Sequence, residues 1–265
     1  MDNNTAEHLN VVIEANIPFS RSVLEPLGVN VRYLQPEAIT PEAMRDVDAL
    51  VTRTRTLCNQ QLLDNSRCTL ITSATIGLDH VDREWCNARG IEVANAPGCN
   101  APAVAQYLFG SITALKGADL SGLTIGIVGV GHVGRIVQRW AGSMGMKVLP
   151  CDPPRQQAEG GNWSSMEQLA EEADIITFHT PLIREGEYAT YHLCNKEFLS
   201  SCKRTPIIVN AARGAVVDTP ALVEALSCGK VSHAVIDCWE NEPQISPELL
   251  NAAIIATPHI AGYSK

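Results

Sequence analysis

The chain has 265 residues, and its 20 Lys and Arg against 29 Asp and Glu give a formal net charge of −9. This length fits one large domain or two modest ones, and a content of 45% hydrophobic and 18% charged residues supplies a buried core. Such a composition excludes a disordered chain, a collagen-like repeat and a coiled coil. The acidic balance argues against a nucleic-acid partner, whose phosphates require a surplus of Lys and Arg.

The N-terminal residues 1–10 are polar and lack the basic start and apolar stretch of a signal peptide, and no apolar run is long enough to cross a membrane. The nine cysteines are odd in number, form no CxxC pair and lie mostly in apolar stretches, which is typical of buried reduced thiols. We therefore expect a cytoplasmic protein without nucleic-acid or membrane partners and without a bound metal.

Short apolar runs alternate with helical patterns in the first third of the chain. We expect strands at residues 11–14, 48–52, 69–72 and 91–94, and helices near residues 19–27, 41–45 and 81–89. This alternation predicts a parallel sheet covered on both faces. Residues 97–102 read Pro-Gly-Cys-Asn-Ala-Pro, and these breakers of regular structure predict a domain boundary and a hinge near residue 100.

The same alternation resumes beyond that boundary. We expect strands at residues 123–128, 147–151, 174–178, 206–210, 233–237 and 253–256, and helices at residues 103–116, 132–144 and 165–172. The predicted fold class is α/β, with two Rossmann-like doubly wound parallel-sheet domains and a cleft between them. Residues 1–100 would form the substrate-binding domain, and residues 101–265 would form the cofactor-binding domain.

A glycine-rich turn follows the apolar strand at 123–128. Gly129, Gly131 and Gly134 form a GxGxxG motif between a strand and a helical pattern, and Asp152 ends the next strand. The three glycines allow a tight turn, close approach to a pyrophosphate, and close packing of helix and strand. An acidic residue at Asp152 would accept hydrogen bonds from the adenosine ribose and repel a 2′-phosphate. The motif therefore favours NAD, although Arg155 leaves NADP open.

Three charged side chains follow three later strands. Arg213, Glu242 and His259 each come just after an apolar run, and ligands of open α/β sheets bind outside the carboxyl ends of the strands. A guanidinium can hold a carboxylate with two hydrogen bonds. A histidine can exchange a proton with a hydroxyl, and a nearby carboxylate can orient that histidine. These residue types in one crevice would suit the oxidation of a hydroxy acid.

Four segments carry a family resemblance that extends over essentially the whole chain. They are residues 129–134, Asn-Ala-Ala-Arg-Gly at 210–214, Glu-Pro at 242–243 and Pro-His at 258–259. They resemble the D-isomer-specific 2-hydroxyacid dehydrogenases. The resemblance implies that Arg213 binds the substrate carboxylate and that Glu242 pairs with His259, which acts as the acid and base.

The resemblance also implies further ligand contacts. The residues expected to contact NAD are Gly129, Gly131, His132, Val133, Gly134, Asp152, Thr180, Ala211, Asp237 and Gly262. The residues expected to contact substrate are Thr54, Thr75 and Tyr263. Arg53 and Arg55 flank Thr54 just past a strand end, and this mixture of positive charge and hydroxyl donors suits a phosphate group.

Other stretches resemble one branch of the family more closely. Residues 14–18, 74–82, 96–101, 151–155, 178–182 and 259–263 match the branch that oxidises 4-phospho-D-erythronate to (R)-3-hydroxy-2-oxo-4-phosphobutanoate in vitamin B6 biosynthesis. Two alternatives stay open: a glycerate, hydroxypyruvate or phosphoglycerate dehydrogenase, and an NAD-sensing corepressor-like protein. Family chains continue well past the catalytic histidine, so we expect that residues follow Lys265 in a full-length homodimer.

Overall fold

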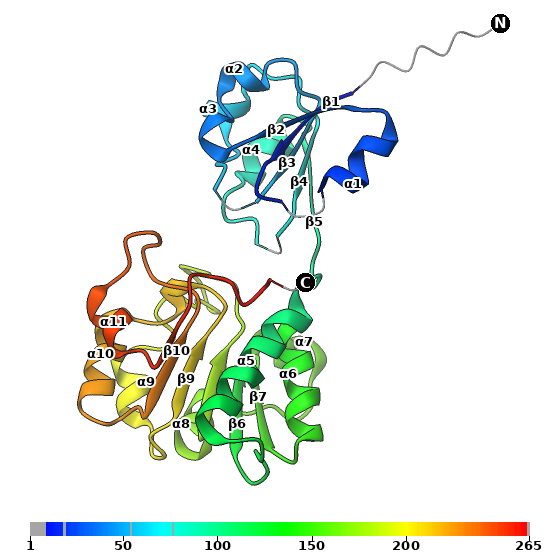
Figure 1. The fold of residues 1–265 in the computed structure, drawn as a ribbon. Helices are drawn as coiled ribbons and strands as arrows, with labels where there is room; N and C mark the ends of the chain where they lie inside the picture. The colour runs from blue at the N-terminus through cyan, green and yellow to red at the C-terminus, as the bar shows by residue number, and fades with distance from the viewer. Residues whose placement is uncertain (1–8, 18–19, 54, 76, 264–265) are drawn as a thin grey trace, which may run out of the picture. The chain divides into compact units, whose positions relative to one another are not determined.

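The structure is a computed structural model that describes residues 9–17, 20–53, 55–75 and 77–263. The chain divides into two compact units, residues 1–99 and 100–265, and each is built on its own parallel β-sheet (Figure 1). The fold class predicted from the sequence, α/β with two Rossmann-like parallel sheets, is confirmed.

The sheet of the first unit has the order β2-β1-β3-β4-β5, with all neighbours parallel. Its strands are β1 (Asn10–Glu14), β2 (Asn30–Leu34), β3 (Ala49–Thr52), β4 (Leu70–Ser73) and β5 (Glu92–Asn95). The strand order reverses between β1 and β3, and ligands of doubly wound sheets bind at such a switch point.

Short helices connect these strands. They are α1 (Ser20–Leu24), η1 (Glu25–Leu27), η2 (Pro36–Ala38), α2 (Pro41–Met44), α3 (Gln60–Leu63) and α4 (Arg83–Ala88). Asn59 and Asp82 begin α3 and α4, because their side chains accept hydrogen bonds from backbone N–H groups of the first turn. One apolar core joins the sheet to α2, α3 and α4 through Val12, Leu50, Ile71, Met44, Leu63 and Cys86.

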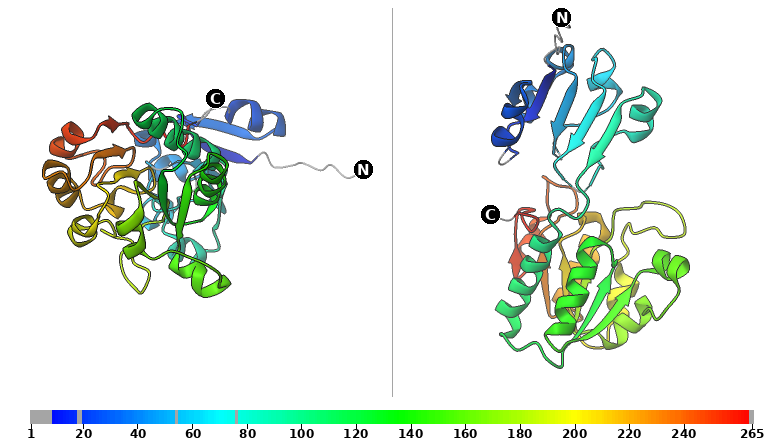
Figure 2. Two further views of the ribbon diagram at one scale, coloured as in Figure 1. Left: turned by 90° about the horizontal axis from the view of Figure 1, so that it is seen from below. Right: turned by 90° about the vertical axis from the view of Figure 1, so that its right-hand side faces the viewer.

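The sheet of the second unit has the order β11-β10-β9-β8-β6-β7, again parallel throughout (Figure 2). Its strands are β6 (Thr124–Val128), β7 (Lys147–Cys151), β8 (Ile175–Phe178), β9 (Ile207–Asn210), β10 (His233–Ile236) and β11 (Ile255–Ala256). β6, β8 and β9 are buried along their whole length, as expected for strands covered on both faces. The switch point lies between β6 and β8.

Helices cover both faces of this sheet. They are α5 (Ala101–Lys116), α6 (His132–Ser143), α7 (Pro153–Glu159), α8 (Met166–Glu172), α9 (Lys196–Ser201), η3 (Gly214–Val216), α10 (Thr219–Ser227) and α11 (Pro247–Ala252). Ile125 and Ile127 pack with α5 and α6 on one face, whereas Ile176 and Phe178 pack with α8 and α9 on the other. Successive strand residues point to opposite faces, which explains this division.

The predicted strands agree with the structure within two residues at each end, but some elements were missed. β2, one of the two edge strands of its sheet, was not predicted, and none of its residues is fully buried. The short helices α3, α7, α9, α10 and α11 were not predicted either. The structure also begins α5 at Ala101 rather than residue 103, because Pro102 is tolerated in a first helical turn. Within the described residues, no helix is long and apolar enough to cross a membrane.

Candidate active site

The glycine-rich turn joins β6 to α6 at the switch point of the second sheet. Gly129 has φ of 87°, and a Cβ there would lie 2.8 Å from the His179 carbonyl oxygen. A Cβ at Gly134 would lie 2.1 Å from the Gly129 carbonyl oxygen, so helix and turn meet backbone to backbone. A Cβ at Gly131, in contrast, would have no neighbouring atom within 4 Å in the described part of the chain. The open side of the turn therefore exposes the N-terminus of α6, beginning at His132 and Val133, which suits a pyrophosphate.

Asp152 stands between the glycine-rich turn and α7. Its Oδ2 accepts a hydrogen bond from the Val130 backbone N–H at 2.8 Å, and its Oδ1 caps α7 by accepting from the Arg155 backbone N–H at 3.2 Å. Each carboxylate oxygen has a second lone pair for a ribose hydroxyl. The Arg155 guanidinium pairs with Glu159 at 2.6 Å and also donates to the Val130 carbonyl. Arg155 was the residue that left NADP possible in the sequence analysis, and its guanidinium is already paired with Glu159 and the Val130 carbonyl.

His179 and Thr180 follow β8 on the other side of the switch point. The Thr180 Oγ1 atom is buried and has no hydrogen-bond partner within the described part of the chain, so it is a ready donor for a ligand. Burial lowers the pKa of His179 to about 4, which keeps its imidazole neutral near pH 7. The His179 Nε2 atom lies 3.0 Å from Thr177 Oγ1. The three-glycine turn, Asp152 and Thr180 together fit a dinucleotide.

The loop after β9 carries Ala211 and Arg213. The Asn210 side-chain amide donates to the Arg213 carbonyl at 2.9 Å, and Arg213 Nη1 donates to the Ala212 carbonyl at 2.8 Å. A Cβ on Gly214 would lie 1.9 Å from the Trp239 carbonyl oxygen, so only glycine fits here. This close approach brings the Arg213 loop against the loop that follows β10.

Glu242 and His259, predicted to form a pair, are in contact. Glu242 Oε2 lies 3.0 Å from His259 Nδ1, and Glu242 Oε1 accepts the Trp239 backbone N–H at 2.7 Å. Burial raises the pKa of Glu242, but the hydrogen bonds from His259 and Trp239, together with the positive charge of Arg213, bring this pKa below its ordinary value. An ionised carboxylate only accepts hydrogen bonds, so His259 Nδ1 is the donor in this contact, and Nε2 is the ring nitrogen that Glu242 does not engage.

Asp237 organises the backbone around His259. It is 1% exposed, and its carboxylate accepts hydrogen bonds from Thr257 Oγ1 at 2.6 Å, Ile260 N–H at 2.8 Å and Ala261 N–H at 2.9 Å. His259 has φ of 57°, a left-handed conformation that is unfavourable for a non-glycine residue and persists where surrounding contacts hold it. The sequence predicted Asp237 only as an NAD contact, and this internal role was not foreseen.

Two further side chains that sequence reasoning missed support this loop. The Trp239 indole N–H donates to the Thr257 carbonyl at 2.8 Å, and Tyr107 on α5 lies with its hydroxyl 2.7 Å from Thr257 Oγ1. Gly262 and Tyr263, predicted as NAD and substrate contacts, end the same loop. A Cβ at Gly262 would lie 2.3 Å from the Asn100 side-chain nitrogen, and Tyr263 is 59% exposed. Tyr107 and Thr257 are far apart in the sequence, so no local pattern indicated their contact.

The first unit holds four of the residues predicted to bind substrate, Arg53, Thr54, Arg55 and Thr75, whereas Tyr263 and Arg213 belong to the second unit. Thr54 lies outside the described residues, while Arg53 is half-buried and Arg55 is exposed on either side of it. The Thr75 hydroxyl lies 2.8 Å from Ser73 Oγ and donates to the Gly77 carbonyl at 3.1 Å, so it stabilises a local turn. These residues follow β3 and β4 at the carboxyl edge of the first sheet.

Glu14, at the end of β1, was not predicted as part of this region. Its side chain is 1% exposed, and its Oε2 accepts hydrogen bonds from Thr52 Oγ1 at 3.1 Å, the Arg53 backbone N–H at 3.1 Å and Thr56 Oγ1 at 2.9 Å. One buried carboxylate therefore fixes the segment that carries Arg53 and Arg55. A Glu that ends an otherwise apolar strand was the available sequence signal.

Comparison with known families identifies the class of protein. Residues 103–261 match the family model described as D-isomer specific 2-hydroxyacid dehydrogenase, NAD binding domain. The chain belongs to the D-isomer-specific 2-hydroxyacid dehydrogenase family, and its cofactor is NAD. Erythronate-4-phosphate dehydrogenase from Bacteroides thetaiotaomicron is 47% identical over 260 residues, which cover 97% of this chain and 75% of that protein.

Solved structures agree with this family. A protein from Thermus thermophilus is similar with a TM-score of 0.80 and 30% identity, covering 96% of this chain and 90% of that one. D-lactate dehydrogenase from Aquifex aeolicus, complexed with NAD and lactic acid, gives a TM-score of 0.77 at 26% identity, covering 97% and 90%. In the described part of the chain, no group of three or more His, Cys, Asp and Glu side chains could hold a metal ion.

Proposed function

We propose that the protein oxidises 4-phospho-D-erythronate at C2 with NAD, giving (R)-3-hydroxy-2-oxo-4-phosphobutanoate and NADH, in vitamin B6 biosynthesis. The contact between Glu242 and His259 beside the Arg213 loop is the observation that carries this proposal. The relatives named erythronate-4-phosphate dehydrogenase, at 41–47% identity over 97% of the chain, support the choice of substrate.

The proposed chemistry uses three side chains of the second unit. Arg213 holds the substrate carboxylate through its guanidinium. His259 Nε2 takes the C2 hydroxyl proton as the carbonyl forms, and Glu242 stabilises the resulting imidazolium through the hydrogen bond at Nδ1. When bound, NAD⁺ accepts the hydride that leaves C2, so the oxidation is balanced by one NADH and one proton.

We assign cofactor binding to the glycine-rich turn, Asp152 and Thr180, with Ala211, Asp237 and Gly262 as further contacts. The open space at Gly131 and the Thr180 hydroxyl, which has no hydrogen-bond partner among the described residues, support this assignment. The hydrogen bonds and ion pair of Arg155 support NAD over NADP, because a 2′-phosphate would have to compete with Glu159.

We assign phosphate recognition to Thr54, Arg53 and Arg55 in the first unit, with Thr75 and Tyr263 as further substrate contacts. Two arginines in a segment fixed by Glu14 support the assignment, because a phosphate is bound best by preorganised cationic donors. The substrate-binding role of residues 1–100 is part of the same proposal.

We further propose a cytoplasmic homodimer. The nine cysteines are all free thiols and seven of them are buried, as is usual in a reducing compartment. The dimer is carried over from the family resemblance, and sedimentation of the purified protein tests it.

A substrate panel tests the proposed reaction. NADH absorbance is followed with 4-phospho-D-erythronate, D-glycerate and 3-phosphoglycerate, and we expect turnover with the first alone. Preference for either other acid would contradict the substrate but not the catalytic residues. His259→Ala should abolish turnover while NADH fluorescence still reports binding, and unchanged turnover in this variant would contradict the proposed base.

A further inference from the structure

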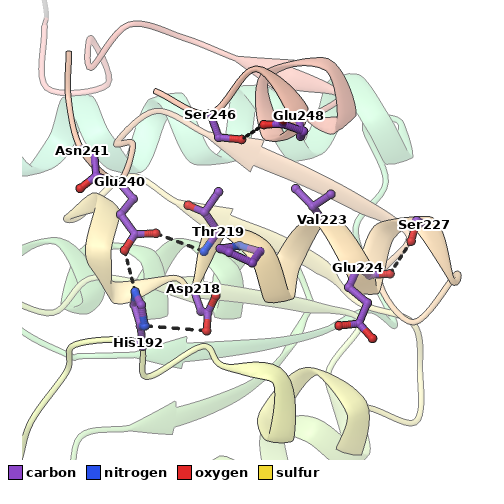
Figure 3. Close-up of a pocket in the computed structure, with 11 residues that line it drawn as sticks. His192, Asp218, Thr219, Val223, Glu224, Ser227, Glu240, Asn241, Ser246 and Glu248 are labelled. Carbon is purple, nitrogen blue, oxygen red and sulfur yellow. Dashed lines mark hydrogen bonds and ion pairs between the residues drawn. The ribbon is translucent and has the colours of Figure 1, made fainter. Parts of the chain in front are cut away.

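A second histidine–carboxylate pair, His192 and Glu240, involves the same loop that carries Glu242. His192 Nε2 lies 2.6 Å from Glu240 Oε1, and the other Glu240 oxygen accepts the Thr219 backbone N–H at 3.2 Å (Figure 3). The Glu240 side chain is 13% exposed. Neither residue has a role in the proposed reaction, although only Asn241 separates Glu240 from Glu242.

His192 is anchored to the segment that follows Arg213. Its backbone N–H donates to the Ala215 carbonyl at 2.8 Å, and the Cys194 N–H donates to the Val216 carbonyl at 3.0 Å. The imidazole also stacks on Tyr191, with ring centroids 3.9 Å apart. The contact between His192 and Glu240 therefore connects the segment that follows Arg213 with the loop that carries Glu242.

The loop between these anchors has a shape that needs external support. Asn241 has φ of 62° and His192 has φ of 50°, and such left-handed conformations in non-glycine residues persist only where neighbouring contacts hold them. On the inner side, Trp239 and Glu242 are joined by a hydrogen bond of 2.7 Å. On the outer side, the Glu240 carboxylate contacts His192 and Thr219.

We propose that His192 and Glu240 form a positioning pair that holds the Glu240–Asn241–Glu242 turn, so that Glu242 remains aligned with His259. This inference rests on the proposed catalytic roles of Glu242 and His259. It adds two residues that touch neither substrate nor cofactor and that act on catalysis through Glu242.

The surroundings of the pair provide a matched control. His192 and Glu240 line a pocket of about 940 Å³ that also includes Asp218, Glu224 and Glu248. Asp218 Oδ2 lies 3.7 Å from His192 Nδ1, whereas Glu248 is hydrogen-bonded to Ser246 at 2.7 Å. Glu248→Gln therefore removes a carboxylate from the same pocket and leaves the positioning pair intact.

A double-mutant cycle tests the proposal, with rates measured on the acid that the parent enzyme oxidises fastest. We expect His192→Ala and Glu240→Ala each to lower kcat about tenfold, because a small displacement of a catalytic group is costly, while KM for NAD stays unchanged. The double variant should fall no further, since paired residues are not additive. His192→Gln, which keeps a side-chain N–H donor, should restore most of kcat, and Glu248→Gln should retain the parent rate.

Hydrogen exchange at the Trp239 amide gives a readout that is independent of turnover. We expect faster exchange in His192→Ala and Glu240→Ala than in the parent and Glu248→Gln. Parent-like kcat with unchanged Trp239 exchange in both variants, or fully additive losses, would overturn the positioning role. If His259→Ala retains turnover, the proposed catalytic base is wrong, and the exchange data still decide whether the pair holds the loop.

Discussion

The Asp237 carboxylate accepts hydrogen bonds from the backbone N–H groups of Ile260 and Ala261, the two residues that follow His259. The His259 backbone N–H donates to the Asp237 carbonyl at 2.9 Å. The orientation of the imidazole thus depends on a residue that does not touch it. Because Asp237 directly follows β10, the rigid sheet is coupled to the loop that presents His259.

Asp237→Asn should damage this loop although the side chain keeps its size. Both carboxylate oxygens accept N–H groups, so one of the donors must face an amide N–H₂ in the variant. We expect a loss of about 1–3 kcal/mol in the free energy of unfolding and a fall in kcat of tenfold or more, on the order of the cost of a misplaced catalytic group. Urea unfolding and NADH production measure the two effects.

Asp119→Asn is the matched control, because Asp119 also accepts hydrogen bonds from a neighbouring residue, Ser121, but is exposed. It should behave like the parent in both assays. Equal stability and equal kcat for Asp237→Asn and the parent would show that the loop does not depend on this carboxylate.

Two glycines of the glycine-rich turn have different surroundings, because Gly131 faces open space and Gly134 packs against the backbone. Alanine variants at these positions therefore distinguish effects on ligand binding from effects on packing. Gly131→Ala places a methyl group where no described atom beyond the adjacent residues lies within 4 Å, and the φ of −77° is not in the left-handed region that favours glycine. We expect an unchanged Tm and NADH binding weakened about tenfold, or roughly 1.4 kcal/mol, because the methyl group faces the expected pyrophosphate. Calorimetry and fluorescence titration check these outcomes.

Gly134→Ala should behave in the opposite way. Its methyl group would lie 2.1 Å from the Gly129 carbonyl oxygen, so the helix must move away from the turn. We expect a loss of stability of about 1–3 kcal/mol, as for other overpacked sites. A Gly131→Ala protein that binds NADH as tightly as the parent would argue against a pyrophosphate at this turn.

The predictability of the fold followed the strength of the apolar pattern. β6, β8 and β9 are wholly buried and were predicted within one residue, whereas the edge strand β2 was missed. The missed helices α9 and α11 are capped by Asn195 and Ser246, whose side chains accept hydrogen bonds from the first turn. These capping residues are visible in the sequence, although helices of six residues give little periodicity.

Some contacts of the candidate site could be predicted from the sequence and others could not. Glu242 and His259 were predicted to share one crevice because both follow strands of one sheet, and parallel strands end at a common edge. Their direct pairing was implied by the family resemblance. The contacts of Asp237 with the His259 loop, and of His192 with Glu240, depend on how loops fold back, which no periodicity encodes. His192 and Glu240 are 48 residues apart, and their pairing became visible only in three dimensions.

His179 should make stability depend on pH. Burial lowers its pKa from 6.5 to about 4, so between these values the unfolded chain binds a proton that the folded chain does not. Stability should therefore fall as the pH drops through this window, by at most about 3 kcal/mol. His179→Asn should remove this part of the slope when urea midpoints are compared across the window. Parallel curves for parent and variant would show that His179 titrates normally in the folded state.

Glu14 should matter for the phosphorylated end of the substrate. Glu14→Ala removes the acceptor shared by Thr52, Arg53 and Thr56, leaving the buried donors unpaired and the Arg53–Arg55 segment unsupported. We expect a loss of about 1–3 kcal/mol in stability and a KM for 4-phospho-D-erythronate raised about tenfold. NADH affinity should be unchanged, because the residues assigned to the cofactor belong to the other unit.

D-Erythronate, which lacks the phosphate, separates this effect from general damage. If the segment binds phosphate, Glu14→Ala should leave KM for the unphosphorylated acid unchanged while it raises KM for the phosphorylated one. Glu92→Gln, at an exposed position that begins β5, should change neither. A rise in both KM values by the same factor would limit Glu14 to folding of the first unit and would remove the support it gives to a phosphate site at Arg53 and Arg55.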